Sequence, residues 1–374
     1  MPSRGELREA EGRGAAPGIR EAAEALRGYQ RWEFHPSKQY VRRHGWLQPI
    51  KLFLQSRAQV GVNTRLKYLT LPGKDAVDVG LLHREGLLPC IDGRWPGLAI
   101  CDSEHATAVV GKIGQPDLGW APKRIEQVLF NPDHKVTRSF PFDVVNLDYC
   151  GPLFVELPNW RLHGRVATLG RICALQKRSA FLLLLTTQDS EHKIDPRARE
   201  RMVEYLSWNL RRDQQFRSQY RATFGSNSPR ACLADFVQFS QIVVPKVVAL
   251  YAAGCAYRVR ELFVANYLRD DERSQGYRMI CHSFEFDPIG RSGPDKYTPD
   301  PTIPDLWTHP SLSPVLTSVS DQDRQMAEAA RSTFVASLPA RSALDVTALL
   351  DNDHTLAEQL QADAEQYRNW WEDL

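Results

Sequence analysis

Residues Phe142–Pro152 read FDVVNLDYCGP, and this stretch decides the fold class. A short apolar run ends in Asp148, which is followed by Tyr149 and, one residue later, by a Gly-Pro pair. Buried parallel strands are nearly continuous apolar runs, and α/β proteins bind ligands at the carboxyl ends of such strands. We therefore expect a strand over 142–147 that delivers Asp148 to a ligand-binding edge of a sheet.

The segments around this stretch alternate between short apolar runs and helical periodicity. Further strands are predicted at 66–71, 98–101, 125–129 and 180–187, and helices at 39–59, 74–88, 105–113, 169–176, 197–216 and 233–253. Two β-rich runs, 257–267 and 277–286, flank a polar stretch and predict an antiparallel hairpin. Strands that alternate with helices indicate an α/β fold with a mostly parallel sheet and helices on both faces.

The composition is that of a globular protein, with 43% hydrophobic and 25% charged residues. No apolar run reaches about 18 residues, so no transmembrane helix and no membrane partner are expected. The N-terminus lacks the apolar core of a secretory signal. The 7 cysteines are scattered without a CxxC pair, which favours reduced thiols in a cytoplasmic protein and predicts no metal cluster.

The charge is distributed unevenly along the chain. Residues 318–374 hold 11 acidic and 4 basic residues, a net charge of −7. The whole chain has a net charge of +2, so residues 1–317 have a net charge of +9. This asymmetry is compatible with an anionic partner for the body, with a tail that folds back on a basic surface, or with solvated surface charge alone. The acidic helices also offer a surface to a protein partner.

The chain divides into four parts at shifts of composition. We expect a disordered or loosely attached N-terminal segment, an α/β domain, a proline-rich connector and an acidic helical C-terminal appendage. These parts cover residues 1–35, 36–293, 294–317 and 318–374.

Five βα units, a long helix and a terminal β-hairpin resemble the class I, Rossmann-like fold of S-adenosylmethionine-dependent methyltransferases. The resemblance covers about residues 60–290. In that family a glycine-rich turn after the first strand approaches the methionine part of the cofactor, and the matching residues here are Leu71, Pro72 and Gly73, with one of the family's glycines. A family acidic residue after the second strand holds the ribose, and Asp102 matches it best, with Glu104 as the alternative. The resemblance thus implies S-adenosylmethionine as the cofactor.

The motif Asp148–Pro152 resembles the Asp-Pro-Phe-Gly motif of transfer-RNA guanine-N2 methyltransferases. The resemblance implies that Asp148 and Tyr149 are catalytic, with Asp148 orienting the amino group of the acceptor base and Tyr149 lying against the base. The first hypothesis is therefore a methyltransferase that acts on a nucleic-acid base nitrogen. The alternative is a catalytically inactive methyltransferase-like scaffold in a multiprotein complex, for example one that processes nucleic acid or serves defence.

Each cofactor residue also has a purely structural interpretation. Gly73 alone can simply turn the chain, and Asp102 can cap the following helix. The chain has no G-x-G-x-x-G fingerprint and no P-loop motif, which argues against dinucleotide and P-loop nucleotide binding.

Two segments combine basic and aromatic side chains in a way that is typical of nucleic-acid binding. Core-facing helices with solvated outer faces have the same composition, so both interpretations stay open. A nucleic-acid-binding module without chemistry is accordingly a third hypothesis. The candidate nucleic-acid-binding residues are Arg42, Arg43, Lys51, Arg211 and Arg212.

Overall fold

The fold is taken from a computed structural model of the chain. It describes residues 33–59, 61, 65–149, 151–154, 164–189, 214–231, 236–269, 277–289 and 343–374, together with the single positions 196, 200, 203, 206, 207, 210 and 211. The predicted connector, most of the N-terminal segment, most of the helix predicted at 197–216 and the first part of the acidic appendage lie outside the described residues.

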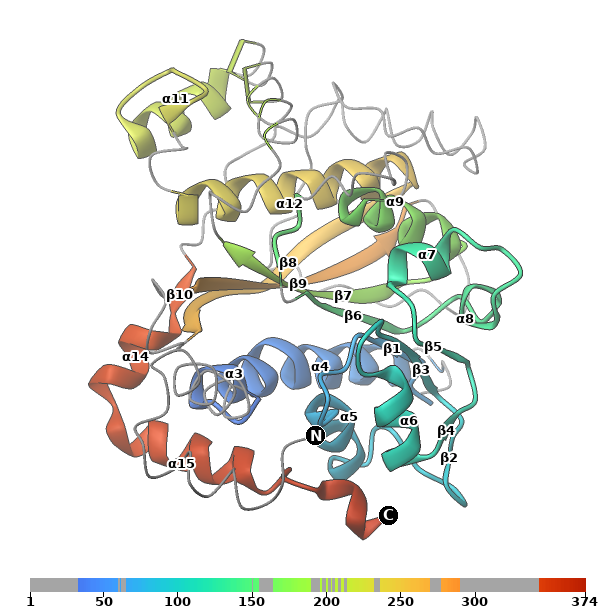
Figure 1. Ribbon diagram of the computed structural model, residues 1–374. Helices are drawn as coiled ribbons and strands as arrows, with labels where there is room; N and C mark the ends of the chain where they lie inside the picture. The colour runs from blue at the N-terminus through green and yellow to red at the C-terminus, as the bar shows by residue number, and fades with distance from the viewer. Residues whose placement is uncertain are drawn as a thin grey trace, which may run out of the picture.

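An eight-stranded mixed sheet forms the centre of the molecule (Figure 1). Its strands lie in the order β10-β8-β9-β7-β6-β1-β3-β5. β9 is antiparallel to both of its neighbours, and the other pairings in this sheet are parallel. The strands are β1 (Tyr68–Thr70), β3 (Leu98–Cys101), β5 (Trp120–Ala121), β6 (Val144–Asp148), β7 (Phe181–Asp189), β8 (Tyr257–Arg269), β9 (Tyr277–Pro288) and β10 (Leu344–Asp345), and a separate small sheet pairs β2 (Arg94–Trp95) with β4 (Gln115–Pro116).

The chain changes direction across the sheet at β1. From β1 it moves to β3 and β5 on one side, and it then returns to β6 and β7 on the other. β1 and β6 are parallel, with Thr70 opposite Asn146, so their carboxyl ends meet at one edge. Such a topological switch point is where open α/β sheets bind ligands.

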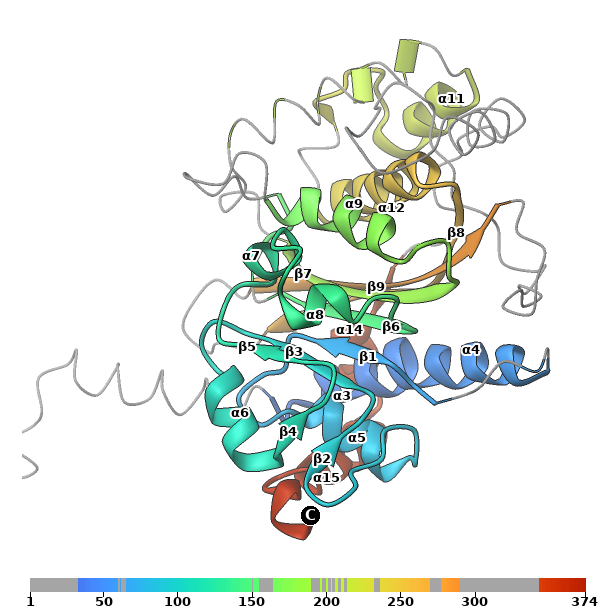
Figure 2. The same cartoon turned by 90° about the vertical axis from the view of Figure 1, so that its right-hand side faces the viewer.

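Helices cover both faces of the sheet (Figures 1 and 2). Each face has its own hydrophobic core, because successive strand residues point to opposite sides. One face carries α7 (Ile125–Leu129), α8 (Lys135–Arg138), α9 (Arg165–Leu175) and α12 (Phe236–Gly254). The other carries α3 (Pro36–Tyr40), η1 (Val41–Leu47), α4 (Gln48–Gln59), α5 (Val77–Arg84), α6 (Ala106–Ile113), α14 (Val346–Asn352) and α15 (His354–Glu365).

The helix predicted at 39–59 is confirmed as one continuous helical run. α3, η1 and α4 follow one another without a break, and η1 has π-helical hydrogen bonding. Short π-helical segments occur frequently at functional sites. The run packs against the face of the sheet that also carries α5, and its Lys38 reaches Asp148 at the carboxyl end of β6.

The predicted strand at 125–129 is wrong, since these residues form the helix α7. Its apolar residues Ile125, Val128 and Leu129 are spaced by three and four, which also fits a helix, and a short apolar run does not distinguish the two. The third parallel strand is instead the two-residue β5. The other predicted strands and the hairpin are confirmed, with ends that shift by a residue or two.

The described part of the acidic appendage packs against the α/β domain. β10 adds a parallel strand to the edge of the sheet beside β8. α15 and the short 3-10 helix η4 (Trp370–Asp373) then run along α3 and α5. Their position across one face is visible in Figure 1.

Candidate functional site

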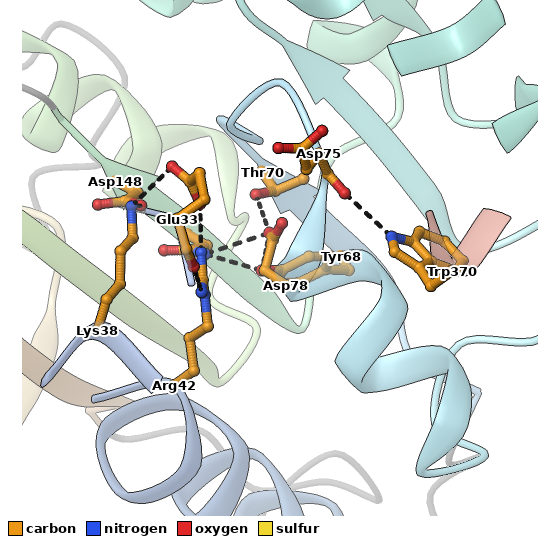
Figure 3. Close-up of polar contacts among 10 residues, drawn as sticks. Glu33, Lys38, Arg42, Tyr68, Thr70, Asp75, Asp78, Asp148 and Trp370 are labelled. Atoms are coloured by element: carbon orange, nitrogen blue, oxygen red, sulfur yellow. Dashed lines mark hydrogen bonds and ion pairs between the residues drawn. The ribbon is translucent and has the colours of Figure 1, made fainter. Parts of the chain in front are cut away.

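Four charged side chains meet at the switch point, and we call Glu33, Lys38, Arg42 and Asp148 the edge cluster (Figure 3). Lys38 Nζ lies 2.9 Å from Asp148 Oδ2 and 3.2 Å from Glu33 Oε1. The Arg42 guanidinium donates hydrogen bonds to the carboxylate and to the backbone carbonyl of Glu33. The Lys38 side chain is 4% exposed and that of Arg42 is 2% exposed. The cluster is therefore a nearly buried network of two cations and two carboxylates.

The helical run and β6 hold three of these four side chains. Asp148 is the last residue of β6. Lys38 and Arg42 are four residues apart, so they lie on the same face of the helical run. His35 caps the start of α3, and Pro36 occupies the first turn, where its missing N–H costs nothing. The start of the helix is thus fixed, and Glu33 lies three residues before Pro36.

The Glu33 carboxylate lies on the backbone of Gly73, in the loop after β1. A Cβ atom on residue 73 would lie 2.6 Å from Glu33 Oε1, so only glycine permits this approach without a shift. Burial raises the pKa of Glu33, but the charges of Lys38 and Arg42 outweigh it and lower that pKa to about 2. Glu33 is therefore ionised at neutral pH.

A second polar network joins β1 and β6 to α5. Asp78, in the first turn of α5, accepts hydrogen bonds from Tyr68 Oη at 2.8 Å and from Thr70 Oγ1 at 2.6 Å (Figure 3). Asn146 Nδ2 donates to the same Tyr68 hydroxyl at 2.8 Å. Burial and the charge of Asp78 raise the pKa of Tyr68 well above its usual range, so the hydroxyl stays a neutral donor. These buried hydrogen bonds therefore join the strand β1 directly to the start of α5.

The C-terminal residues hold the same connection from outside. Trp370 Nε1 donates a hydrogen bond of 3.0 Å to the backbone carbonyl of Asp75 (Figure 3). Lys112 Nζ lies 3.3 Å from Asp75 Oδ1 and 4.0 Å from the centre of the Trp371 ring. Ala76 follows with a φ of 43°, a left-handed conformation that is uncommon for a residue with a Cβ. The loop after β1 is therefore held from both sides.

The predicted cofactor residues lie at one edge of the sheet. Leu71, Pro72 and Gly73 follow β1, and Asp102 follows the parallel strand β3. Asp102 Oδ1 accepts backbone hydrogen bonds from Glu104 at 2.7 Å and from His105 at 2.8 Å, so Asp102 holds the turn that leads into α6. No described residue hydrogen-bonds Asp102 Oδ2. The Glu104 residue itself is exposed.

The structure separates Tyr149 from Asp148. Tyr149 is 5% exposed and lies in the core on the face opposite the edge cluster, and the Arg165 guanidinium lies 4.5 Å from the centre of its ring. Neighbouring residues at a strand end point to opposite faces, so these two side chains do not serve the same ligand. The predicted role of Tyr149 as a platform for an acceptor base does not fit this position.

The predicted nucleic-acid-binding residues of the helical run face the protein's own carboxylates. Arg42 belongs to the edge cluster. Arg43 Nε donates to Asp363 of α15 at 2.8 Å, and its Nη1 lies 2.9 Å from Glu85 Oε1. Lys51 Nζ lies 2.6 Å from Glu85 Oε2. The acidic appendage thus covers part of this basic surface.

The second basic segment is described only in part. Arg211 is an exposed helical residue, and Arg212 lies outside the described residues. Of the four described residues among the five predicted, only Arg211 is free of a carboxylate partner that the structure places on it, so these four do not form one open basic surface.

Reasoning from the sequence missed Glu33, Lys38 and Asp78. The composition places Glu33 in the loosely attached N-terminal segment, yet residues 33–35 are packed and Phe34 is buried. The sequence does contain a signal that could have pointed to Lys38. Lys38 and Arg42, four residues apart, interrupt the apolar face of the helical run. Polar residues on such a face need partners, and these partners mark a site.

Fold and site together define an α/β protein with a mostly parallel sheet and a charged cluster at its switch point. The family model described as PP_RS20740-like matches residues 27–88 and 122–255, just over half of the chain, and the chain belongs to this family. The matched residues include the whole edge cluster and Gly73. No curated protein matched the chain, and no solved structure did.

The described residues contain no group of three or more His, Cys, Asp or Glu side chains arranged to hold a metal ion. None of the described helices combines the length and apolar character that crossing a membrane requires.

Proposed function

We propose that the chain is a class I methyltransferase-like protein that binds S-adenosylmethionine at the carboxyl edges of β1, β3 and β6 and methylates a nucleic-acid base nitrogen. The edge cluster carries this proposal. It gathers charged side chains and a close-approach glycine at the switch point, where ligands of open α/β sheets bind.

The order of the strands supports the proposal. Counting β1, β3, β5, β6, β7, β8 and β9 in sequence, the order across the sheet is 3-2-1-4-5-7-6. This is the doubly wound order with an antiparallel last strand inserted before the sixth. A terminal hairpin of this kind is one of the features by which the sequence resembles class I methyltransferases.

The residues at the edge fit the chemistry of the cofactor. Lys38 and Arg42 suit its carboxylate, Gly73 allows close approach to the backbone, and Asp102 Oδ2 suits a ribose hydroxyl. The cofactor would supply an electrophilic methyl group. Asp148 would accept a hydrogen bond from the acceptor amine and so orient the nitrogen.

Calorimetric titration of the full chain with S-adenosylmethionine tests the proposal. We expect the wild type to bind and Asp102→Ala to lose about 10-fold in affinity, the effect of one hydrogen bond to a charged group. Gly73→Val should abolish binding, because the valine side chain would fill the space in which the ligand approaches the backbone. Gly111→Ala, in α6, is the control, since a Cβ there meets no atom within 4 Å. A folded wild-type chain that does not bind at millimolar ligand contradicts the proposal.

A non-catalytic scaffold is the second candidate, and the Lys38–Asp148 ion pair favours it. Lys38 already pairs with the Asp148 carboxylate that an acceptor amine would need, and Tyr149 lies on the other face of the sheet. A scaffold predicts a copurifying protein partner and an assembly whose activity is unchanged by Asp148→Ala. A loss of methyl transfer in the same variant favours the enzyme instead.

The nucleic-acid part of the proposal is tested by salt dependence. If nucleic acid binds, Arg211→Gln should reduce the slope of log K against log salt by about 1, because one phosphate contact is lost. Lys51→Gln should leave the slope unchanged, since Lys51 is paired with Glu85. An affinity that does not vary with salt contradicts nucleic-acid binding.

A further inference from the structure

The members of the edge cluster differ in how firmly the fold holds them. Asp148 ends a strand in the middle of the sheet, and Lys38 and Arg42 stand on a helical run packed against it. Glu33 lies before α3, outside any helix or strand. Its carboxylate can therefore leave the cluster without unfolding a regular element.

Removing Glu33 would leave the cluster with two cations and one carboxylate. Lys38 and Arg42 are almost fully buried, and a buried uncompensated charge is strongly unfavourable. An anion would have to replace Glu33. A carboxylate suits the position, since the Arg42 guanidinium and the Lys38 ammonium already bind one there. Gly73 has no side chain that would keep a carboxylate away from the backbone.

We propose that Lys38, Arg42 and Gly73 form a binding site for the carboxylate of an amino-acid-bearing ligand, and that Glu33 fills this site until the ligand displaces it. The inference rests on the proposed function in so far as S-adenosylmethionine is a ligand of this class. Glu33 then acts as a built-in competitor. The apparent affinity equals the intrinsic affinity multiplied by the fraction of chains in which Glu33 has left the site.

Calorimetric titration with S-adenosylmethionine tests the competition. We expect Glu33→Gln to bind about 10-fold more tightly or better, because the neutral amide competes less well for the two cations. Glu85→Gln is the matched control, since Glu85 also pairs with an arginine and a lysine but lies outside the cluster. It should bind like the wild type. Equal or weaker binding by Glu33→Gln overturns the competition.

A second measurement needs no cofactor. In Glu33→Ala, sodium propionate should restore the missing carboxylate and raise Tm by about 2–5 °C above sodium chloride at the same ionic strength. The wild type and Glu33→Ala/Arg42→Met should show no such difference. If Glu33→Ala does not fold, Glu33→Ser takes its place with formate as the smaller anion. No rescue overturns the carboxylate site.

The two measurements separate the inference from the proposed function. Rescue by propionate without S-adenosylmethionine binding in any variant supports the carboxylate site and contradicts the proposed function. Cofactor binding without rescue and without a gain in Glu33→Gln supports the proposed function and overturns the inference. Failure of both measurements overturns both.

Discussion

Gly80→Ala should destabilise the protein, although the same change stabilises most helices. Gly80 lies inside α5, where alanine is normally favoured over glycine by about 0.5–1 kcal/mol. Here an added Cβ would lie 2.6 Å from the Trp370 ring, which is packed on the helix. Overpacking of this kind costs about 1–3 kcal/mol. The strained ring would also weaken its hydrogen bond to Asp75, worth about 0.5–1.5 kcal/mol. We therefore expect a net loss of about 1–3 kcal/mol.

Trp370→Ala reverses the sign of this effect. Alone it should cost about 3–5 kcal/mol, since it removes a buried indole. In that background the Gly80→Ala methyl enters vacated space, so the helix preference returns and the change stabilises by about 0.5–1 kcal/mol. The coupling between the two sites is then about 2–4 kcal/mol.

The assay is equilibrium unfolding in guanidinium chloride, followed by far-UV circular dichroism at constant m. Gly111→Ala, which meets no atom, is the matched control and should stabilise by about 0.5–1 kcal/mol. The reasoning is refuted if Gly80→Ala stabilises the wild type as Gly111→Ala does, or if the coupling is near zero. Either result would mean that the C-terminal segment does not pack on α5.

Three further predictions concern the site. The folded pKa of Glu33, about 2, lies below its ordinary value of 4.5, so its stabilisation is complete above about pH 4.5 and is lost as pH falls toward 2. Between pH 6 and pH 3 the free energy of unfolding of the wild type should fall by roughly 2 kcal/mol more than that of Glu33→Gln, because Glu33 in the folded chain is still mostly ionised at pH 3. Denaturant midpoints measure this difference, and equal losses in both chains would contradict the ion pairs. Lys38→Met should lower the free energy of unfolding by about 3–5 kcal/mol in the same assay, because it leaves Asp148 without its cation. Adding Asp148→Asn to this variant should restore part of the loss, and strictly additive losses would exclude a direct pair. Tyr149→Phe should change stability by less than about 0.5 kcal/mol, because no described residue hydrogen-bonds its hydroxyl. Methyl transfer, if present, should persist in a folded Tyr149→Leu chain, which lacks the ring, and its loss would restore the role predicted from the sequence.

Local patterns were sufficient for most of the fold. The run at 98–101 is apolar throughout and the run at 142–147 is mostly apolar, as strands buried on both faces are. The hairpin follows from two β-rich runs around a polar turn. The strand predicted at 125–129 is wrong because this five-residue segment, with apolar residues at 125, 128 and 129, fits a helix as well as a strand. β5 was missed because two residues give no period, and its place beside β3 comes from pairing with a distant segment.

The sequence by itself determined the α/β class and the position of Asp148 at the carboxyl end of a strand, because both follow from the period of apolar residues along the chain. Only the tertiary structure decided that Glu33 and Lys38 join Asp148, that Tyr149 turns to the other face and that the C-terminal residues hold the loop after β1. These contacts join residues far apart in the sequence. Their formation depends on how sheet and helices pack, which no local pattern specifies.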